Sequence, residues 1–231
     1  MPRTGFARLE PSLESVPLRQ GQQVDRAGEP VSSVYFVNRG FVSMVKTMRD
    51  GRSVEVGGVG IEGLTSPSTV LALDTAALDS VVQIPGRAFR IKREILKREL
   101  ERDPILLRLI EHYARYLLSQ VAQTAACNRL HSVEERSCRW LLVAHDNALS
   151  DRFPLTQEFL ATMLGAQRPG VSLAARVLKK AGLIDYSRGQ IQILDREGLE
   201  QESCECYQAS RKELDALYAG RLQRARRSIR A

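Results

Sequence analysis

The spacing of hydrophobic residues divides the chain into an N-terminal part with a period of two and a C-terminal part with a helical period. Residues 1–30 are rich in Pro and Gly, which predicts irregular structure there. Short β-type runs then predict strands at 34–37, 41–46, 53–56, 78–84 and 88–91. Asp50-Gly51 between two of these runs is a strong hairpin signal. Together they predict a small antiparallel barrel or roll over residues 20–92.

From Lys92 onward the pattern becomes helical, and the longest predicted helix covers residues 105–126. Asp103 and Pro104 before it suit a helix cap and a first turn. A narrow stripe of mostly apolar residues runs along one side of this helix. Such a stripe is typical of a helix that pairs with its own copy, although it would also suit packing on the β roll. We predict a dimer interface from the residues of this stripe: Leu106, Leu109, Ile110, Tyr113, Leu117, Gln120 and Val121.

Two short helices joined by a tight turn are predicted over residues 155–178. A helix beginning at Ser132 and ending near His145 precedes them, and residues 147–154 form a polar linker. Thr156 is placed to cap the first short helix, and Gly165 permits the turn. Pro169 suits the first turn of the second. This order is typical of a helix-turn-helix, which places side chains in the DNA major groove.

The second short helix supplies the predicted DNA-contacting face. Val171, Ala174, Ala175 and Leu178 repeat at helical spacing and face inward, which leaves Arg168, Ser172 and Arg176 outside. A small hairpin at 183–194, with Arg188 at its tip, follows as a wing beside the helix. An arginine at the start of the helix, such as Arg168, can donate two hydrogen bonds to guanine. Cations further along the helix, Arg176 and Lys179, are expected to contact phosphates. The predicted DNA-binding residues are Thr156, Gln157, Gln167, Arg168, Ser172, Arg176, Lys179 and Arg188.

Composition and charge support a DNA-binding globular protein. The 231 residues are 43% hydrophobic and 26% charged, with a net charge of +7. No apolar run approaches the roughly 18 residues of a membrane-spanning helix, so we expect a cytoplasmic protein with no membrane partner. Residues 211–231 hold 7 basic and 2 acidic groups, which suits either phosphate contact or a solvated terminus. The basic tail includes Arg221, Arg224, Arg226, Arg227 and Arg230.

Two groups of cysteines and histidines suggest metal binding or catalysis, but neither function is predicted for them. Cys204-Glu205-Cys206 suits metal or redox chemistry, but on one short helix its two thiols point about 200° apart, so ordinary packing is preferred and no metal is predicted. Cys138 near His145 suggests a nucleophile and a base, yet nothing in the sequence holds them together, and Cys138 is expected in the core. The sequence therefore predicts no catalytic residue and no enzyme.

The order of parts resembles the Crp/Fnr family of bacterial regulators. The resemblance covers roughly residues 20–195 and is most specific at 155–161 and 179–184. It implies a cyclic-nucleotide-binding-like β roll, a long dimer helix and a C-terminal winged helix-turn-helix. It also implies that Arg168 contacts a base. The next position, often acidic in the family, is Pro169, and a second base-reading arginine is replaced by Leu173, so we expect an unusual operator.

The sensory half departs further from the family. Residues 60–64 resemble the start of the phosphate cassette of members that bind cyclic nucleotides, which implies Gly60, Glu62 and Gly63 as ligand-binding candidates. Residues 73–79 have two aspartates and no arginine to pair with a cyclic phosphate, so an effector other than a cyclic nucleotide is expected.

No cofactor is predicted for this half either. No cysteine precedes Cys127, so the iron–sulfur cluster of the redox members is not expected. A haem sensor would need a His or Cys in the roll, but all three histidines lie on or beside the predicted helices.

These observations predict an α+β fold in three parts. A sensory β roll of jelly-roll type covers residues 1–100, a dimerisation helix 101–130, and a winged helix-turn-helix domain with its basic tail 131–231. The predicted function is a homodimeric transcription regulator on a near-palindromic operator. Its partners would be double-stranded DNA, a second copy, RNA polymerase and a small-molecule effector of unknown identity. The alternative is a ligand-binding regulatory subunit whose C-terminal helices bind a protein partner.

Overall fold

The computed structural model describes residues 3–67 and 74–218, and these form two compact units. Among the described residues, the first unit combines the stretches 3–44, 58–67 and 74–119, and the second combines 45–57 with 120–218. Leu73, the first residue of the segment 73–79 that contains two aspartates, lies outside the described residues. The five arginines of the predicted basic tail also lie outside them.

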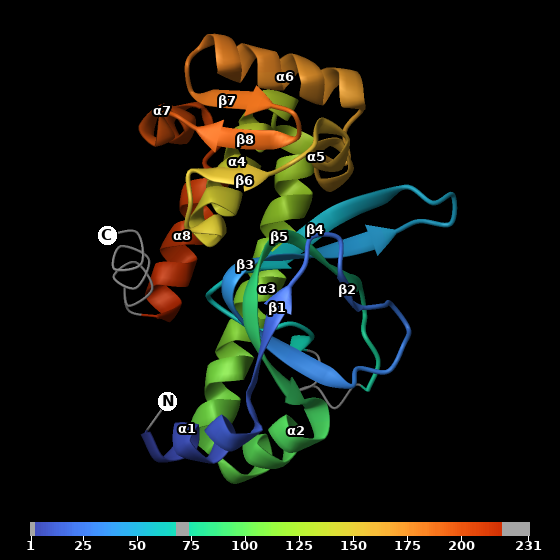
Figure 1. Cartoon of the computed structure of the whole chain (residues 1–231), viewed down its shortest axis with the longest axis vertical. Helices are drawn as coiled ribbons and strands as arrows, with labels where there is room; N and C mark the ends of the chain where they lie inside the picture. The colour runs from blue at the N-terminus through green and yellow to red at the C-terminus, as the bar shows by residue number, and fades with distance from the viewer. Residues whose placement is uncertain (1–2, 68–73, 219–231) are drawn as a thin grey trace. The chain divides into compact units, whose positions relative to one another are not determined.

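A five-stranded antiparallel sheet forms the centre of the first unit (Figure 1), with strand order β1-β5-β3-β4 and β2 paired with β5. The expectation of irregular structure over residues 1–30 was wrong, because this stretch contains a helix and two strands. Pro17 lies within β1, an edge strand where its missing N–H is tolerated, and it hides the strand pattern. The elements are α1 (Arg3–Leu9), a 3-10 turn (Glu10–Ser12), β1 (Glu14–Leu18), β2 (Gln23–Asp25), β3 (Ser33–Thr47), β4 (Ser53–Val59) and β5 (Asp79–Lys92).

The hairpin predicted at Asp50-Gly51 is confirmed, but the strands around it are longer than expected. β3 and β5 each merge two predicted strands. In the sequence, each pair of predicted strands is separated at a glycine, Gly40 in β3 and Gly86 in β5. These two glycines lie against each other, since a Cβ atom on Gly86 would be 1.9 Å from the backbone oxygen of Arg39, next to Gly40. The glycines thus permit close backbone approach within a continuous sheet, where the sequence suggested strand ends.

Two helices follow the sheet, α2 (Arg93–Arg102) and α3 (Pro104–Leu130). The predicted cap at Asp103 is confirmed, since its Oδ1 accepts hydrogen bonds from the backbone N–H of Ile105 at 3.0 Å and of Leu106 at 3.1 Å. At 27 residues, α3 is longer than the predicted helix.

Part of the predicted dimer stripe is buried within the chain itself. Leu106, Ile110, Tyr113 and Leu117 are each at most 6% exposed, so these four residues form core and offer no surface to a second copy. For these positions the alternative of packing within the chain was correct, because the stripe was the inward face of an amphipathic helix. Leu109, Gln120 and Val121 remain at least partly accessible.

The second unit begins in α3 and contains a helical core with a three-stranded sheet of order β6-β8-β7. The serine cap predicted for its first full helix is confirmed as a capping box: Ser132 Oγ accepts from Glu135 N at 3.2 Å, and Glu135 Oε2 accepts from Ser132 N at 2.8 Å. The elements are α4 (Val133–Ala148), β6 (Arg152–Pro154), α5 (Gln157–Leu164), α6 (Arg168–Lys180), β7 (Ile184–Ser187), β8 (Gln190–Ile193), α7 (Arg196–Glu202) and α8 (Cys206–Leu217).

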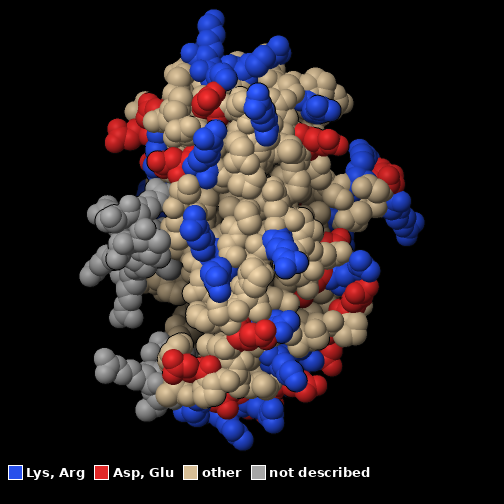
Figure 2. All heavy atoms as spheres, viewed as in Figure 1, with Lys and Arg blue, Asp and Glu red and all other residues tan. Residues whose placement is uncertain are grey.

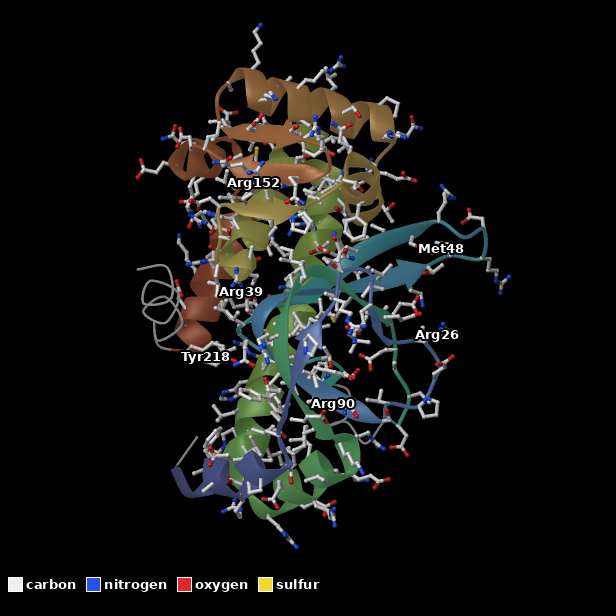
Figure 3. The ribbon with its side chains drawn as sticks, in the orientation of Figure 1. Arg26, Arg39, Met48, Arg90, Arg152 and Tyr218 are labelled. Carbon is white, nitrogen blue, oxygen red and sulfur yellow. The ribbon has the colours of Figure 1, made fainter. Side chains whose placement is uncertain are left out.

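Residues 147–154 are not a simple linker, contrary to prediction. Their start completes α4, and their end is β6, which pairs with β8 through Phe153 opposite Ile191. Arg152, labelled in Figure 3, begins this strand. A three-residue strand with an alternating pattern is too short to give a periodic signal in the sequence.

The tip of the β3–β4 hairpin belongs to the second unit. The indole Nε1 of Trp140 in α4 donates to Glu55 Oε2 at 3.3 Å, and both side chains are buried. Met48, labelled in Figure 3, lies in the turn and is 57% exposed. Among the described residues no helix combines the length and apolar character needed to cross a membrane. The predicted α+β class is confirmed: an antiparallel sheet, a long helix and a helix-turn-helix with a small wing sheet.

Candidate nucleic-acid interface

Helices α5 and α6 form the predicted helix-turn-helix, and each local signal for it is confirmed. Thr156 Oγ1 accepts from the backbone N–H of Phe159 at 3.2 Å and so caps α5. Gly165 ends α5 at φ +57°, a left-handed conformation that glycine adopts without strain. Pro169 occupies the first turn of α6, where no backbone N–H is needed. The angle between the helices is thus held by caps and a turn that the sequence encodes locally.

Helix α6 has one buried face and one exposed face. Val171, Ala174 and Leu178 are at most 3% exposed and pack inward, as predicted. Figure 2 shows Lys and Arg side chains projecting at the top of the view, where α6 lies in Figure 1. The exposed residues of α6 are Arg168, Pro169, Leu173, Arg176, Val177, Lys179 and Lys180.

The outward face is rotated from the one predicted. At about 100° per residue, the direction opposite the buried residues passes through Pro169, Leu173, Arg176 and Lys180. Arg168 and Ser172 lie at the flank, because steps of four residues drift by about 40° each around a helix with 3.6 residues per turn. Leu173 and Val177 are 49% and 48% exposed, and the sequence interpretation gave neither a role in binding. Counting the outward direction from the buried residues would have identified Leu173, whereas Val177 lies at the flank opposite Arg168.

Two predicted contact residues are engaged within the protein. Ser172 is half-buried, and its Oγ donates to Gln157 Oε1 at 2.7 Å, so this pair links α6 to the start of α5. The backbone N–H of Gln157 also donates to the Tyr186 hydroxyl at 3.2 Å. The side chains of Ser172 and Gln157 therefore position α6, the recognition helix of the pair. Gln167, at the N-cap of α6, is exposed.

The wing is the hairpin of β7 and β8, with Arg188 at its tip as predicted. Ser187 pairs with Gln190, and Arg188 and Gly189 between them have φ values of +49° and +73°, as in a tight hairpin turn. Arg188 is exposed. Lys179 Nζ lies 2.6 Å from Asp185 Oδ1, and this hydrogen bond lowers the pKa of the Asp185 carboxyl. Lys179 thus ties α6 to the wing, and Lys180 is the more available cation.

The three ligand-binding candidates of the first unit form a turn held by its own groups. Glu62 is 7% exposed, and its Oε1 accepts from the backbone N–H of Gly60 at 2.7 Å. A Cβ on Gly63 would lie 1.9 Å from Cζ of Tyr113, so this glycine makes room for a core ring. A cavity of 180 Å³ in the same unit is lined by Asp25, Tyr35 and their neighbours and includes none of the three. The structure gives these residues a packing role.

Cys138 and His145 do not form a catalytic pair. Both are buried, at 0% and 2% exposure. His145 Nε2 is 2.6 Å from Asp151 Oδ1 and its Nδ1 is 2.9 Å from Arg196 Nη1, so both ring nitrogens are engaged. Burial raises the pKa of the Cys138 thiol to about 12, which keeps it protonated and unreactive at neutral pH. The expectation that Cys138 is a core residue is confirmed.

Comparison with known proteins agrees with this geometry. Residues 135–202, which include α5, α6 and the wing, match the model of the Crp-like helix-turn-helix domain. The chain is also 25% identical over 210 residues to the HTH-type transcriptional regulator Cmr of Mycobacterium tuberculosis, covering 85% of this chain and 79% of that one. Residues 135–202 therefore form a Crp-like helix-turn-helix domain, and most of the chain is similar to a transcriptional regulator. These matches make the chain similar to DNA-binding transcription regulators of the Crp type.

Solved structures of bacterial regulators share the fold of this chain. FixK2 from Bradyrhizobium japonicum superimposes with a TM-score of 0.68 at 19% identity, over 83% of this chain and 98% of that one. A Crp/Fnr-family regulator from Eubacterium rectale gives 0.68 at 17% identity, over 87% and 94%. The resemblance to Crp/Fnr regulators found in the sequence is thus matched in the fold, over more than four fifths of the chain.

Proposed function

We propose that this regulator binds a near-palindromic operator as a homodimer, with α6 of each copy in the major groove. The observation that carries the proposal is the exposed surface of α6, which presents Arg168 and Arg176 beside exposed apolar side chains, with a third arginine at the wing tip. Two-fold related recognition helices would enter grooves about 34 Å apart. Since the genome of a bacterium lies in its cytoplasm, the protein would act there.

Five of the exposed side chains have a matching DNA group. Arg168, at the N-terminal end of α6, suits the two acceptors of a guanine. Leu173 and Val177 are apolar, so they suit the methyl group of thymine. Arg176 and Arg188 suit phosphates on either side of the recognition helix. The proposed operator half-site therefore contains a guanine and a thymine in fixed register.

The proposed dimer surface is the exposed side of α3. Leu118 is 71% exposed, and Ala122 and Ala125, four and seven residues later, are also exposed. Small residues beside a large one let two helices approach closely. Of the accessible residues of the predicted stripe, Val121 would lie at the margin of this surface, while Leu109 and Gln120 lie on the other side of α3, about 180° and 160° around the helix from Leu118.

The effector is proposed to be something other than a cyclic nucleotide. The segment of residues 60–79 contains no arginine or lysine to neutralise a cyclic phosphate, while it contains Asp74 and Asp79. Arg93 in α2 pairs with Asp74, so the nearby cation is already engaged. Glu62 accepts a hydrogen bond from its own turn and would repel an anion. RNA polymerase is a further proposed partner, as expected for a regulator that acts at promoters.

Selection of bound duplexes from random DNA tests this function, followed by titration at several salt concentrations. We expect a two-fold symmetric consensus, dimeric stoichiometry and an affinity that falls as salt rises. Repeating the selection with candidate ligands would reveal an effector. Binding without sequence preference, together with capture of a defined protein by α5 and α6, would favour the alternative of a regulatory subunit.

A further inference from the structure

Three cysteines and a histidine from distant parts of the chain meet in the second unit. Cys127 and His131 lie one turn apart at the end of α3, and Cys204 and Cys206 lie where α7 gives way to α8. Their possible ligand atoms all lie within 4.8 Å of one another, and all three thiols are free and buried. The prediction that Cys204 and Cys206 share one helix was wrong, because α7 ends at Glu202 and α8 begins at Cys206.

The spacing of these atoms fits a tetrahedral metal site. Cys127 Sγ lies 3.5 Å from Cys204 Sγ, and Cys206 Sγ lies 3.5 Å from His131 Nδ1. In a tetrahedron with zinc–sulfur bonds of about 2.3 Å and zinc–nitrogen bonds of about 2.0 Å, S···S edges are about 3.8 Å and S···N edges about 3.5 Å. These two edges already match the tetrahedron to within a few tenths of an ångström, and since all the ligand atoms lie within 4.8 Å of one another, the remaining edges need to shorten by about 1 Å at most.

The histidine is oriented as a metal ligand usually is. His131 Nε2 lies 3.1 Å from Glu205 Oε2, while Nδ1 faces the thiols. A carboxylate that accepts from one ring nitrogen fixes the tautomer and leaves the lone pair of the other nitrogen for a metal. In addition, the side-chain amide of Gln123 donates to Cys206 Sγ at 2.9 Å. A sulfur that accepts such a bond is stabilised as a thiolate.

Charge around the cluster also favours bound thiolates. Arg136 and Arg139 in α4 are 7% and 8% exposed, and both interact electrostatically with Cys127. Their Nε atoms are buried without a hydrogen-bond partner among the described residues. A divalent ion held by three thiolates and a neutral imidazole carries one net negative charge. Such a complex would compensate two buried cations that are otherwise costly to desolvate.

We propose that Cys127, His131, Cys204 and Cys206 form a tetrahedral binding site for a thiophilic divalent ion of the zinc type. A set of three cysteines and one histidine is typical of structural zinc sites, which leave no position open for a substrate. The ion would join the end of α3 to the connection between α7 and α8, within the unit that carries the helix-turn-helix. The site is independent of the proposed operator and of any effector of the first unit.

Metal titration of the full-length protein tests this proposal directly. The protein is stripped of metal under reducing conditions, loaded with Co²⁺ and then displaced with Zn²⁺. We expect one equivalent of cobalt, visible d–d bands of tetrahedral geometry, and a charge-transfer band with the intensity of three thiolates. Zn²⁺ should abolish these bands. The wild-type spectrum alone counts the ligands, so the test does not depend on whether a cysteine variant folds.

Variants separate the cluster from other thiols. Cys204→Ser is expected to lose the tetrahedral spectrum, whereas Cys138→Ser should keep it, since Cys138 is equally buried but lies outside the cluster. Glu205→Gln should retain the spectrum but weaken metal affinity by about tenfold, because its carboxylate orients His131. The proposal is overturned by wild-type protein that binds no cobalt, by binding that Cys204→Ser leaves unchanged, or by a Cys127–Cys204 disulfide that persists in metal-loaded protein.

Discussion

Replacement of Arg168 by alanine gives the sharpest test of how α6 recognises DNA. The side chain of Arg168 is exposed and makes no hydrogen bond or ion pair with another described residue. It occupies the first position of α6, where a positive charge gains nothing from the helix dipole. Its removal should therefore leave the free energy of unfolding unchanged to within about 0.5 kcal/mol. The whole effect of the substitution should appear in DNA binding.

The expected magnitude follows from the proposed guanine contact. Loss of a bidentate contact weakens binding by about 1–3 kcal/mol per half-site and relaxes specificity at that position. For one half-site this is a decrease of about 5–150-fold in affinity. A homodimer carries the substitution twice, so the loss on a full operator should be about 2–6 kcal/mol if the half-sites act independently.

The assay is fluorescence anisotropy on the selected operator and on duplexes with each base pair changed, at several salt concentrations. The matched control is Arg188→Ala, also an exposed arginine, at the wing tip. That control should weaken binding equally on all duplexes and reduce the salt slope by about 1 per subunit, as loss of a phosphate contact does. If Arg168→Ala behaves in the same way, the guanine contact is refuted, and if neither affinity nor specificity changes, Arg168 does not touch DNA.

Three further substitutions test the dimer surface, a helix cap in the second unit and the core packing within the first unit. Leu118→Glu should convert the dimer to a monomer in light scattering, since it places a charge on the exposed face of α3, while the folded circular dichroism spectrum is kept. Ser132→Ala should lower the free energy of unfolding by about 1 kcal/mol in urea denaturation, because it removes half of the capping box with Glu135; an unchanged midpoint would contradict this. Gly63→Ala should destabilise the first unit by about 1–3 kcal/mol in thermal unfolding, because its methyl group overlaps the buried ring of Tyr113; a neutral effect would show that the ring moves aside.

The parts of the fold that the sequence predicted well are those with local causes. The capping side chains of Asp103, Ser132 and Thr156 each bond a backbone N–H two or three residues away, so a short window of sequence contains the whole signal. The same holds for the turn at Gly165. These signals placed the long helix and the helix-turn-helix correctly.

The parts that the sequence did not predict depend on partners far along the chain. β1 forms only because β5, some 70 residues later, supplies its hydrogen bonds, with Glu14 opposite Arg90. Cys127 and Cys204 are separated by 77 positions, and no local pattern brings them together. The rotation of the outward face of α6 is a different case, because the helical period contained that information and a count in steps of four missed it.

Helix α3 has to serve the core, a second copy and the metal site at once, and its geometry allows this. Cys127 follows Leu118 by nine residues, which at about 100° per residue places the two on opposite sides of the helix. Dimerisation and metal binding therefore do not compete for surface. Bound metal changes operator affinity only if the ion binds the free and DNA-bound states differently. Linkage then requires that operator DNA change the metal affinity by the same factor by which metal changes the operator affinity. Unequal factors in the two titrations would mean that metal changes the amount of folded protein instead.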